Sequence, residues 1–416
     1  MLFVIWNAIN DPLFGYIQDV STTWFHCRTK VISYMGPCLA VSFLILWFPW
    51  SSTYQLSSPY VVGSHLIVGL FLYDAFYSCV NVAWNALFAE TTCNKSERIS
   101  ALKFSQFAVL LSVNVVPITE KLTNGLTDFR IFQCISVGIS ILALLCFKVT
   151  GSLQYQKNLL LEDLPSATPL HEKSEKKFMH AFKITKQILT KSDFRIITIT
   201  YFLHACRSAI HLNFATIATE LLIPEKIMMK GSWKMSLFYA ACTLIPQLLV
   251  ILSGNMITRV GAASVIRKSF MASMITSVFL LIFGYNRPYL IVLFMLFDSI
   301  SVHSIAPLYQ VLMADYADDD MIYFSRQKPV STIIYSLAAL LVRPAQSIAP
   351  FAVVMILTHF GYKEYQISNV VTMRLTDGMF LVVCSTTLVI SVAQLMVFYP
   401  FALKCSAKHS KEDIFL

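Results

Sequence analysis

Long apolar runs separated by short polar turns make up most of the chain. Each run has about 20 residues, the length that a helix needs to cross the hydrocarbon core of a bilayer. Hydrophobic and polar residues do not alternate within the runs, as they would in the strands of a membrane barrel. Because backbone groups in lipid must hydrogen-bond internally, the pattern predicts an all-α polytopic membrane protein. We count eleven such segments, near 2–18, 31–48, 61–88, 102–119, 130–148, 196–222, 234–254, 267–285, 288–313, 330–358 and 378–402.

Composition supports the same class. Hydrophobic residues make up 56% of the chain and charged residues 13%, whereas a soluble domain carries about 25% charged residues. We attribute the net charge of +9 to cytosolic loops that face membrane lipids, and expect no nucleic-acid partner. The sequence contains no nucleotide-binding loop, catalytic triad or metal-ligand cluster. We therefore expect no enzyme activity, no catalytic residue, no metal and no cofactor other than a coupling cation.

One long polar stretch, from Gly151 to Asp193, interrupts the apolar pattern. Its charge and its two prolines indicate a linker between two membrane halves, with a helix expected at its C-terminal end. The predicted domains are an N-terminal bundle with five visible helices at 1–150, a cytosolic linker at 151–194, a six-helix bundle at 195–403 and a tail at 404–416.

The distribution of basic residues predicts the orientation. Most of the 32 lysines and arginines lie on the side of the linker, which is cytosolic by the positive-inside rule. The C-terminus is then cytosolic, in the plasma membrane or an internal membrane. Eleven spans put Met1 outside, at the edge of a helix. We expect that a first helix is missing, through a truncated isoform or an incomplete gene model; an eleven-span protein is the alternative.

The two halves resemble each other. "LYDAFYSCVNVAWNALFAE", which begins at Leu72, is similar to "LFDSISVHSIAPLYQVLMAD", which begins at Leu296. Two six-helix halves joined by a cytosolic linker are the plan of a transporter that binds its substrate between the halves. Asp74 and Asp298 occupy equivalent places in this repeat. They either meet partners across the interface between the halves or belong to polar networks inside each half.

Polar groups within apolar helices are the candidate site residues. His204, Arg207 and His211 follow an i, i+3, i+7 spacing and share one helical face, which is typical of a water-filled cavity. The alternative is that His204 and Arg207 lie near the cytosolic end and extend to the surface. No acidic or cysteine ligand accompanies the three on this helical face, so we expect no metal there. His303, five residues after Asp298, is expected to point elsewhere.

Acidic groups near the predicted membrane edge have separate interpretations. Asp11 must face protein or water, because a carboxylate at the bilayer centre costs roughly 2.5–3.5 kcal/mol. It is either part of a cation or proton site or the partner of a basic side chain. Asp19 is expected to organise its turn with Arg28 or Lys30. The cluster "DYADDD", which begins at Asp315, is expected to form a salt-bridge lock between helices rather than a calcium site.

Three motifs resemble one family. "NDPLFGYIQD", "NALFAETTCNKSERISAL" and "LLVRPAQSIAP" are similar to the second, fourth and eleventh helices of the glycoside–pentoside–hexuronide:cation symporter branch of the major facilitator superfamily. The resemblance covers nearly the whole chain. It implies the major facilitator fold of two six-helix bundles, with the first helix absent here.

The resemblance also implies roles for individual residues. Asp11 corresponds to an acid of the cation site, whereas Asn7 and Asn81 stand where the family has further carboxylates. Gln106 stands near the position of a sugar-binding arginine, and Arg343 at that of a lysine close to the cation site. Counter-ion candidates for Arg343 are Asp11 and Asp74. A sodium site prefers several anionic oxygens, whereas one buried carboxyl can still carry a proton, so proton coupling or facilitated movement is favoured over sodium coupling and galactoside binding.

Two hypotheses of function remain at this stage. The first is a secondary transporter of a small organic solute, such as a carbohydrate, coupled to H⁺ or Na⁺. Its path would be lined by Gln106, Arg343, His204, Arg207, His211, Asp74 and Asp298. The second is a transporter-like receptor or scaffold that no longer transports, which the replaced carboxylates favour. The sequence leaves the oligomeric state open.

Overall fold

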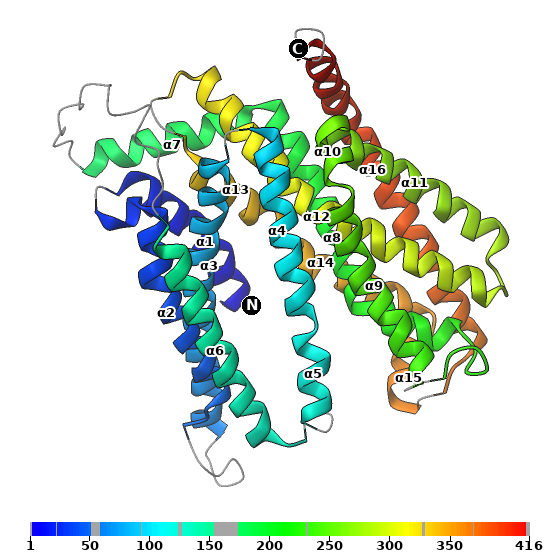
Figure 1. Cartoon of the computed structure of the whole chain (residues 1–416). Helices are drawn as coiled ribbons and strands as arrows, with labels where there is room; N and C mark the ends of the chain where they lie inside the picture. The colour runs from blue at the N-terminus through cyan, green and yellow to red at the C-terminus, as the bar shows by residue number, and fades with distance from the viewer. Residues whose placement is uncertain are drawn as a thin grey trace. The chain divides into compact units, whose positions relative to one another are not determined.

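The polar and apolar pattern folds into helices alone in the part of the chain that the structure describes (Figure 1). This computed structural model describes residues 2–21, 23–50, 59–92, 94–123, 127–153, 174–229, 232–326, 329–368 and 370–412. The helices are α1 (Leu2–Val20), a short 3₁₀ turn η1 (Trp24–His26), α2 (Arg28–Trp47), α3 (Pro59–Thr91), α4 (Lys95–Val113), α5 (Val115–Leu122), α6 (Phe129–Gly151), α7 (Ser174–Thr190), α8 (Ser192–Leu222), α9 (Trp233–Leu252), α10 (Gly254–Val260), α11 (Ala262–Phe283), α12 (Pro288–Tyr323), α13 (Ser331–Val342), α14 (Ala345–His359), α15 (Tyr362–Ser368) and α16 (Met373–Glu412).

Each of the eleven apolar segments coincides with helix. By length and composition, nine helical stretches among the described residues can cross a membrane. The helices α1 and α8 correspond to the other two predicted spans. Their polar residues, Asp11 in α1 and Arg207 in α8 among them, lower the hydropathy below that of the nine. The helix α7 is the one expected at the C-terminal end of the linker.

Two segments predicted as continuous spans are interrupted. The segment near 102–119 is broken at Asn114, between α4 and α5, and the segment near 330–358 is broken between α13 and α14. A proline lies close to each break, and its ring nitrogen has no hydrogen to donate to the carbonyl four residues earlier. Pro117 leaves the Val113 carbonyl without that bond. Pro344 directly follows Arg343 and thereby sets this arginine at a helix break.

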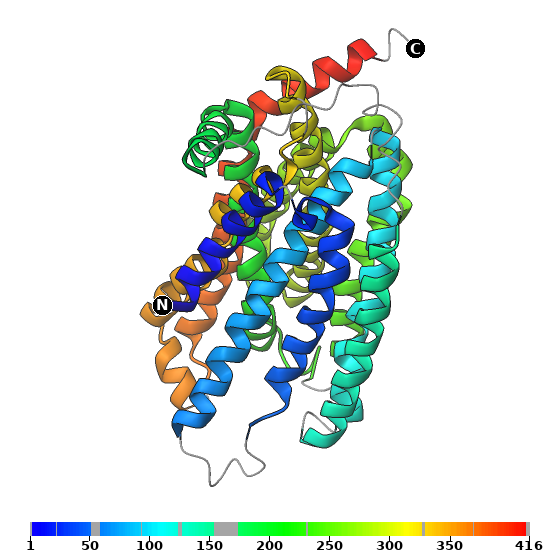
Figure 2. The ribbon, with the colours of Figure 1, turned by 90° about the vertical axis from the view of Figure 1, so that its left-hand side faces the viewer.

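The Cα positions divide the chain into two compact units. Unit 1 comprises Met1–Cys93, Val113–Lys191 and Met313–Leu340. Within it, α2 packs against α3 and α6 (Figure 2), and α1 packs against α3. Its core includes the fully buried side chains of Val31, Cys79 and Ala83. Small residues allow the close contacts, since a Cβ added at Gly36 of α2 would lie 2.5 Å from the Phe147 ring of α6.

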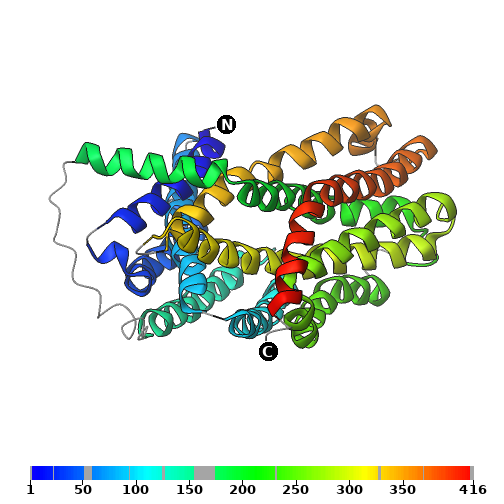
Figure 3. The ribbon, with the colours of Figure 1, turned by 90° about the horizontal axis from the view of Figure 1, so that it is seen from above.

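Unit 2 comprises Asn94–Ser112, Ser192–Leu312 and Leu341–Leu416. The helix α16 packs against α8 and α11, and α14 packs against α8 (Figure 3). Gly261 joins α10 to α11 with φ of +84°, a conformation that glycine adopts without the steric cost of a Cβ. An apolar core that includes Phe214, Leu357 and Met379 fills one part of unit 2.

Candidate functional site

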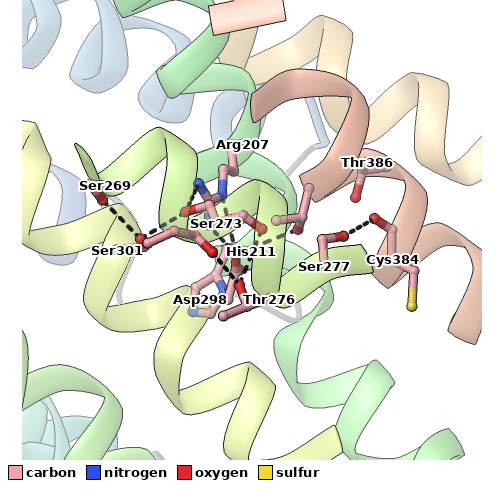
Figure 4. A network of polar contacts seen from close by, with 12 residues as sticks. Arg207, His211, Ser269, Ser273, Thr276, Ser277, Asp298, Ser301, Cys384 and Thr386 are labelled. Carbon is pink, nitrogen blue, oxygen red and sulfur yellow. Dashed lines mark hydrogen bonds and ion pairs between the residues drawn. The ribbon is translucent and has the colours of Figure 1, made fainter. Parts of the chain in front are cut away.

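A buried ion pair joins α8 to α12 within unit 2. Arg207 donates to the Oδ1 atom of Asp298 from Nε at 3.1 Å and from Nη2 at 2.5 Å (Figure 4). His211, one turn further along α8, places its Nδ1 atom 2.9 Å from Asp298 Oδ2. The Thr387 hydroxyl of α16 donates to Oδ1 at 3.4 Å. Both oxygens of this carboxylate on α12 are therefore engaged, by groups from α8 and α16.

Hydroxyl groups extend the network from the arginine. Arg207 donates from Nη1 to the Ser273 hydroxyl of α11 at 3.0 Å. Ser273 lies 2.9 Å from Ser301 of α12, which lies 3.0 Å from Ser269 of α11. Figure 4 shows these serines lying in a row beside the guanidinium. Serine hydroxyls both donate and accept, so Ser273 can accept from the guanidinium while the row continues to Ser301 and Ser269.

A cavity of about 40 Å³ adjoins the ion pair within unit 2. Arg207, His211, Asp298 and two threonines form its polar part, and the remaining wall is apolar. A volume of this size is large enough for a water molecule, which needs at least 10–15 Å³ and two or more polar partners. The apolar wall is made by Ile210, Phe214, Ala215, Ala218, Phe294, Met295, Met379, Val382 and Val383.

Two expectations about the neighbouring polar residues are wrong. Arg207 is only 3% exposed and pairs with Asp298, so it does not extend to the surface. An acidic group also accompanies the α8 residues, since Asp298 reaches them from another helix. Among the described residues, however, no three His, Cys, Asp or Glu side chains lie close enough together to hold a metal ion.

The histidines around the ion pair have different surroundings. His204 is 2% exposed, and its ring lies 5.3 Å from that of Tyr309, centre to centre. His303 was expected to point elsewhere, but its ring meets the His211 ring edge-on at a centre distance of 5.8 Å. The five-residue spacing does turn His303 away from Asp298 on α12. The His303 ring nevertheless contacts the His211 ring, because His211 lies on a different helix, α8.

Asp11, predicted for the cation or proton site, and Asp74, predicted for the substrate path, both lie in unit 1. Asp11 on α1 and Asp74 on α3 are 0% and 7% exposed. Asn10 donates from Nδ2 to Asp74 Oδ2 at 2.8 Å and so links α1 to α3. Asn81 is half-buried on α3, and its carbonyl groups accept from Asn85. The backbone of Asn7 belongs to α1, while its side chain lies outside the described residues.

Asp19 organises its turn as expected. Its Oδ1 atom accepts from Arg28 Nη2 at 2.5 Å, and Glu90 of α3 accepts from the same nitrogen at 3.2 Å. Asp19 Oδ2 accepts from the backbone N–H of Ile333, at the start of α13, at 3.0 Å. A carboxylate at a helix N-terminus interacts favourably with the helix dipole. The turn between α1 and α2 is thus joined to α3 and α13 within unit 1.

Gln106 and Arg343 are the remaining candidates of the substrate path. Gln106 is 6% exposed on α4, and Arg343 is half-buried at the break between α13 and α14. Both belong to unit 2. The predicted roles of Gln106 and Arg343 stay predictions, as do those of Asp11, Asn7 and Asn81.

The sequence of the chain matches a known family. The family model described as "MFS/sugar transport protein" matches residues 1–402. The chain belongs to this family. It is similar to transmembrane protein 180 of Gallus gallus, with 25% identity over 399 residues, covering 89% of this chain and 75% of the relative. The Mus musculus protein of the same name is 24% identical over 381 residues, covering 84% and 70%. The chain thus spans roughly three quarters of the length of these relatives.

Solved structures share the fold of the family. The human organic anion transporter MFSD10 aligns with a TM-score of 0.59 and 13% identity, covering 96% of this chain and 81% of that one. The proton:xylose symporter XylE aligns with a TM-score of 0.61 and 13% identity, covering 96% and 84%. A bacterial homologue of the iron transporter ferroportin aligns with a TM-score of 0.60 and 12% identity, covering 96% and 88%. The fold is the all-α major facilitator fold of a multi-pass membrane transporter family.

Several members of the polar networks have no distinctive signal in the sequence. Asn10, Ser273, Ser301 and Thr387 are small polar residues within helices, and such residues are common in membrane spans. Ser269 and Ser273 are four residues apart and therefore share a face of α11. The spacing alone does not identify the helices, α8 and α12, that this face of α11 contacts.

Proposed function

We propose that the chain is a secondary transporter that moves a small organic solute across a membrane by alternating access. Carbohydrates are the first class to test, and a proton or another cation is the proposed coupling ion. The observation that carries the proposal is a buried Arg207–Asp298 pair beside a cavity, in a chain of the MFS/sugar transport protein family. Charges this deep in a membrane protein usually mark a substrate or ion path.

The buried acids of unit 1 support ion coupling. Asp11 and Asp74 are both at most 7% exposed, and the Asn10 amide connects the two helices that carry them. In our proposal Asp11 takes up the coupling proton, and Asn7 and Asn81 contribute to the same site. Arg343 and Gln106 line the path of the solute, and the C-terminus stays in the cytosol.

A receptor or scaffold without transport is the second candidate. The specific observation in its favour is that the Asp298 carboxylate is fully engaged by Arg207, His211 and Thr387. A network of this kind can serve stability alone. Under this hypothesis, substitutions in the proposed path leave partner binding unchanged, whereas deletion of the linker abolishes it.

Thermal unfolding of the purified full chain in lipid nanodiscs tests the first candidate. The panel contains sugars, glycosides, nucleosides and lysolipids, each with and without sodium at two pH values. A ligand at 100 times its Kd stabilises the folded state by about 2.7 kcal/mol. We expect one class to raise the Tm selectively and to be taken up by proteoliposomes. Asp11→Asn should abolish the pH dependence of uptake, whereas Asp128→Asn, at an exposed position before α6, should preserve it.

The outcomes separate the two candidates. Selective stabilisation followed by uptake supports transport and names the solute class. Uptake with the same pH dependence in Asp11→Asn overturns the role of Asp11. If the folded protein shows no stabilisation and no uptake with any class, the transport proposal fails for those solutes and the receptor hypothesis gains support.

A further inference from the structure

His211 lines the cavity and has one of its two ring nitrogens bound to Asp298. Its Nδ1 atom lies 2.9 Å from Asp298 Oδ2, and the residue is part of the cavity lining. Asp298 also binds Arg207 through Oδ1. A carboxylate paired with an arginine is ionised and can only accept hydrogen bonds. The hydrogen between His211 and Asp298 therefore belongs to Nδ1 of the imidazole.

This assignment fixes the tautomer of neutral His211. With the hydrogen on Nδ1, the Nε2 atom carries a lone pair and is the place where a proton can be added. Within the described part of the chain, no hydrogen bond to Nε2 is formed. When Nε2 binds a proton, the imidazolium still donates from Nδ1 to Asp298, so the existing bond becomes charge-assisted and stronger.

The charges around His211 make such a protonation tolerable. The ion pair of Arg207 and Asp298 is neutral overall, so proton binding adds a single positive charge next to a carboxylate that it already touches. Arg207 also donates to Ser273, which continues to Ser301 and Ser269. These hydroxyls can accept hydrogen bonds from the guanidinium when Asp298 interacts more strongly with the imidazolium.

The titratable and charged groups on every element packed near His211 are few. On α12 they are Asp298 and His303, whose ring meets that of His211. On α8 itself they are Arg207 and His204. The network residues of α11 and α16 are the serines and Thr387, which do not titrate in this range. The only titratable side chain of α14 is His359, at its C-terminal end.

We propose that His211 is a reversible proton-binding site, held ready by Asp298 and Arg207. A proton from water bonds to the Nε2 lone pair, and the same bond breaks on release; no other bond changes. This inference deepens the transport proposal, since it names H⁺ as a ligand of unit 2. It rests on the transport proposal only for the coupling of the bound proton to solute movement. The geometry of proton binding stands independently.

Solid-state NMR of ¹⁵N-histidine in the full chain, reconstituted in lipid bilayers, tests the site between pH 5 and 9. Ile210–His211 is the only Ile-His pair in the sequence, so ¹³C-carbonyl isoleucine with ¹⁵N-histidine identifies the His211 signals in the unmodified protein. We expect Nδ1 to be protonated throughout and Nε2 to change from unprotonated to protonated as the pH falls. Asp298→Asn should change the tautomer or the titration of His211.

Two further variants test whether the titrating NMR signal belongs to His211 and not to another histidine. His359→Gln, at an exposed histidine, and His303→Gln should both leave a titrating His211 signal. The proposal is overturned if His211 Nε2 stays unprotonated down to pH 5, if Nδ1 lacks its hydrogen, or if the titrating signal disappears in His303→Gln. If His211 titrates in a protein that transports nothing, the proton site is supported and the transport proposal is contradicted. If uptake depends on pH while His211 does not titrate, the transport proposal is supported and the proton site at His211 is contradicted.

Discussion

At the scale of single residues, the buried Arg207–Asp298 pair connects α8 to α12 within unit 2. Both side chains are at most 10% exposed. Removing charges from water is costly, and their mutual attraction offsets that cost only when the geometry is good and the other polar atoms are bonded. Here Ser273, His211 and Thr387 provide these further bonds. The pair is consequently stable as a whole and vulnerable to the loss of either member.

Substitution of one member should therefore be worse than substitution of both. We expect Arg207→Met to lower the free energy of unfolding by about 3–5 kcal/mol, because it leaves the Asp298 charge buried without its arginine. Asp298→Leu should have a similar effect, and the double variant should recover most of the loss. Reversible unfolding in mixed micelles measures all three. A double variant as unstable as the sum of the single ones would contradict this account.

At the scale of elements, proline and glycine decide where helices break and how closely they approach. Pro117 and Pro344 interrupt two apolar segments that hydropathy alone would make continuous. Gly15 lets α1 approach α13 within unit 1, since an added Cβ would lie 2.3 Å from the Ser336 hydroxyl and 2.9 Å from the Thr332 carbonyl oxygen. The backbone oxygen has little freedom to move, so this contact requires glycine.

A matched pair of glycine substitutions tests the α1–α13 contact. Gly15→Ala should destabilise the protein by about 1–3 kcal/mol, the usual cost of overpacking. Gly138→Ala in α6 is the control, because nothing lies within 4 Å of its added Cβ. Alanine also favours helix over glycine by up to about 1 kcal/mol, so Gly138→Ala should be neutral or stabilising. Equal effects of the two substitutions in thermal unfolding would refute the role of Gly15.

At the scale of the whole molecule, the linker is fastened to the end of α12 within unit 1. Asp320, which is fully buried, accepts from Arg326 Nε at 2.7 Å, and Lys191 Nζ lies 4.0 Å from its other oxygen. Arg326 also donates to Gln187 of α7 at 3.2 Å. Lys191 lies 4.1 Å from the centre of the Tyr323 ring, a cation–π distance. This is the expected salt-bridge lock, formed by Asp320 of the acidic cluster.

Loss of this lock should loosen the linker helix. Asp320→Ala removes the anion shared by Lys191 and Arg326, so amide hydrogen exchange of α7 (Ser174–Thr190) should become several-fold faster while that of α11 stays the same. Asp319→Ala changes the neighbouring, exposed acid and should leave α7 as protected as in the unsubstituted chain. Unchanged exchange in Asp320→Ala would show that other contacts hold α7.

The sequence by itself determined the class of the protein and the course of its helices. Apolar runs of membrane length must be helical, because lipid offers no partner to the backbone. The charge and prolines of the polar stretch located the linker, with a helix at its C-terminal end, and the spacing on α8 placed Arg207 and His211 on one face. The turn acid Asp19 and its partner Arg28 could also be predicted, since they lie close together along the chain.

Only the tertiary structure decided which helices the polar faces meet. Spacing along α8 gives the direction of Arg207 but does not say that α12 brings Asp298 there, that His303 reaches His211, or that Asn10 bonds Asp74. These contacts join residues far apart in the sequence, whose proximity depends on the packing of several helices at once. Helical periodicity fixes the direction of a side chain around its own axis, while the identity of its neighbour is a property of the folded bundle.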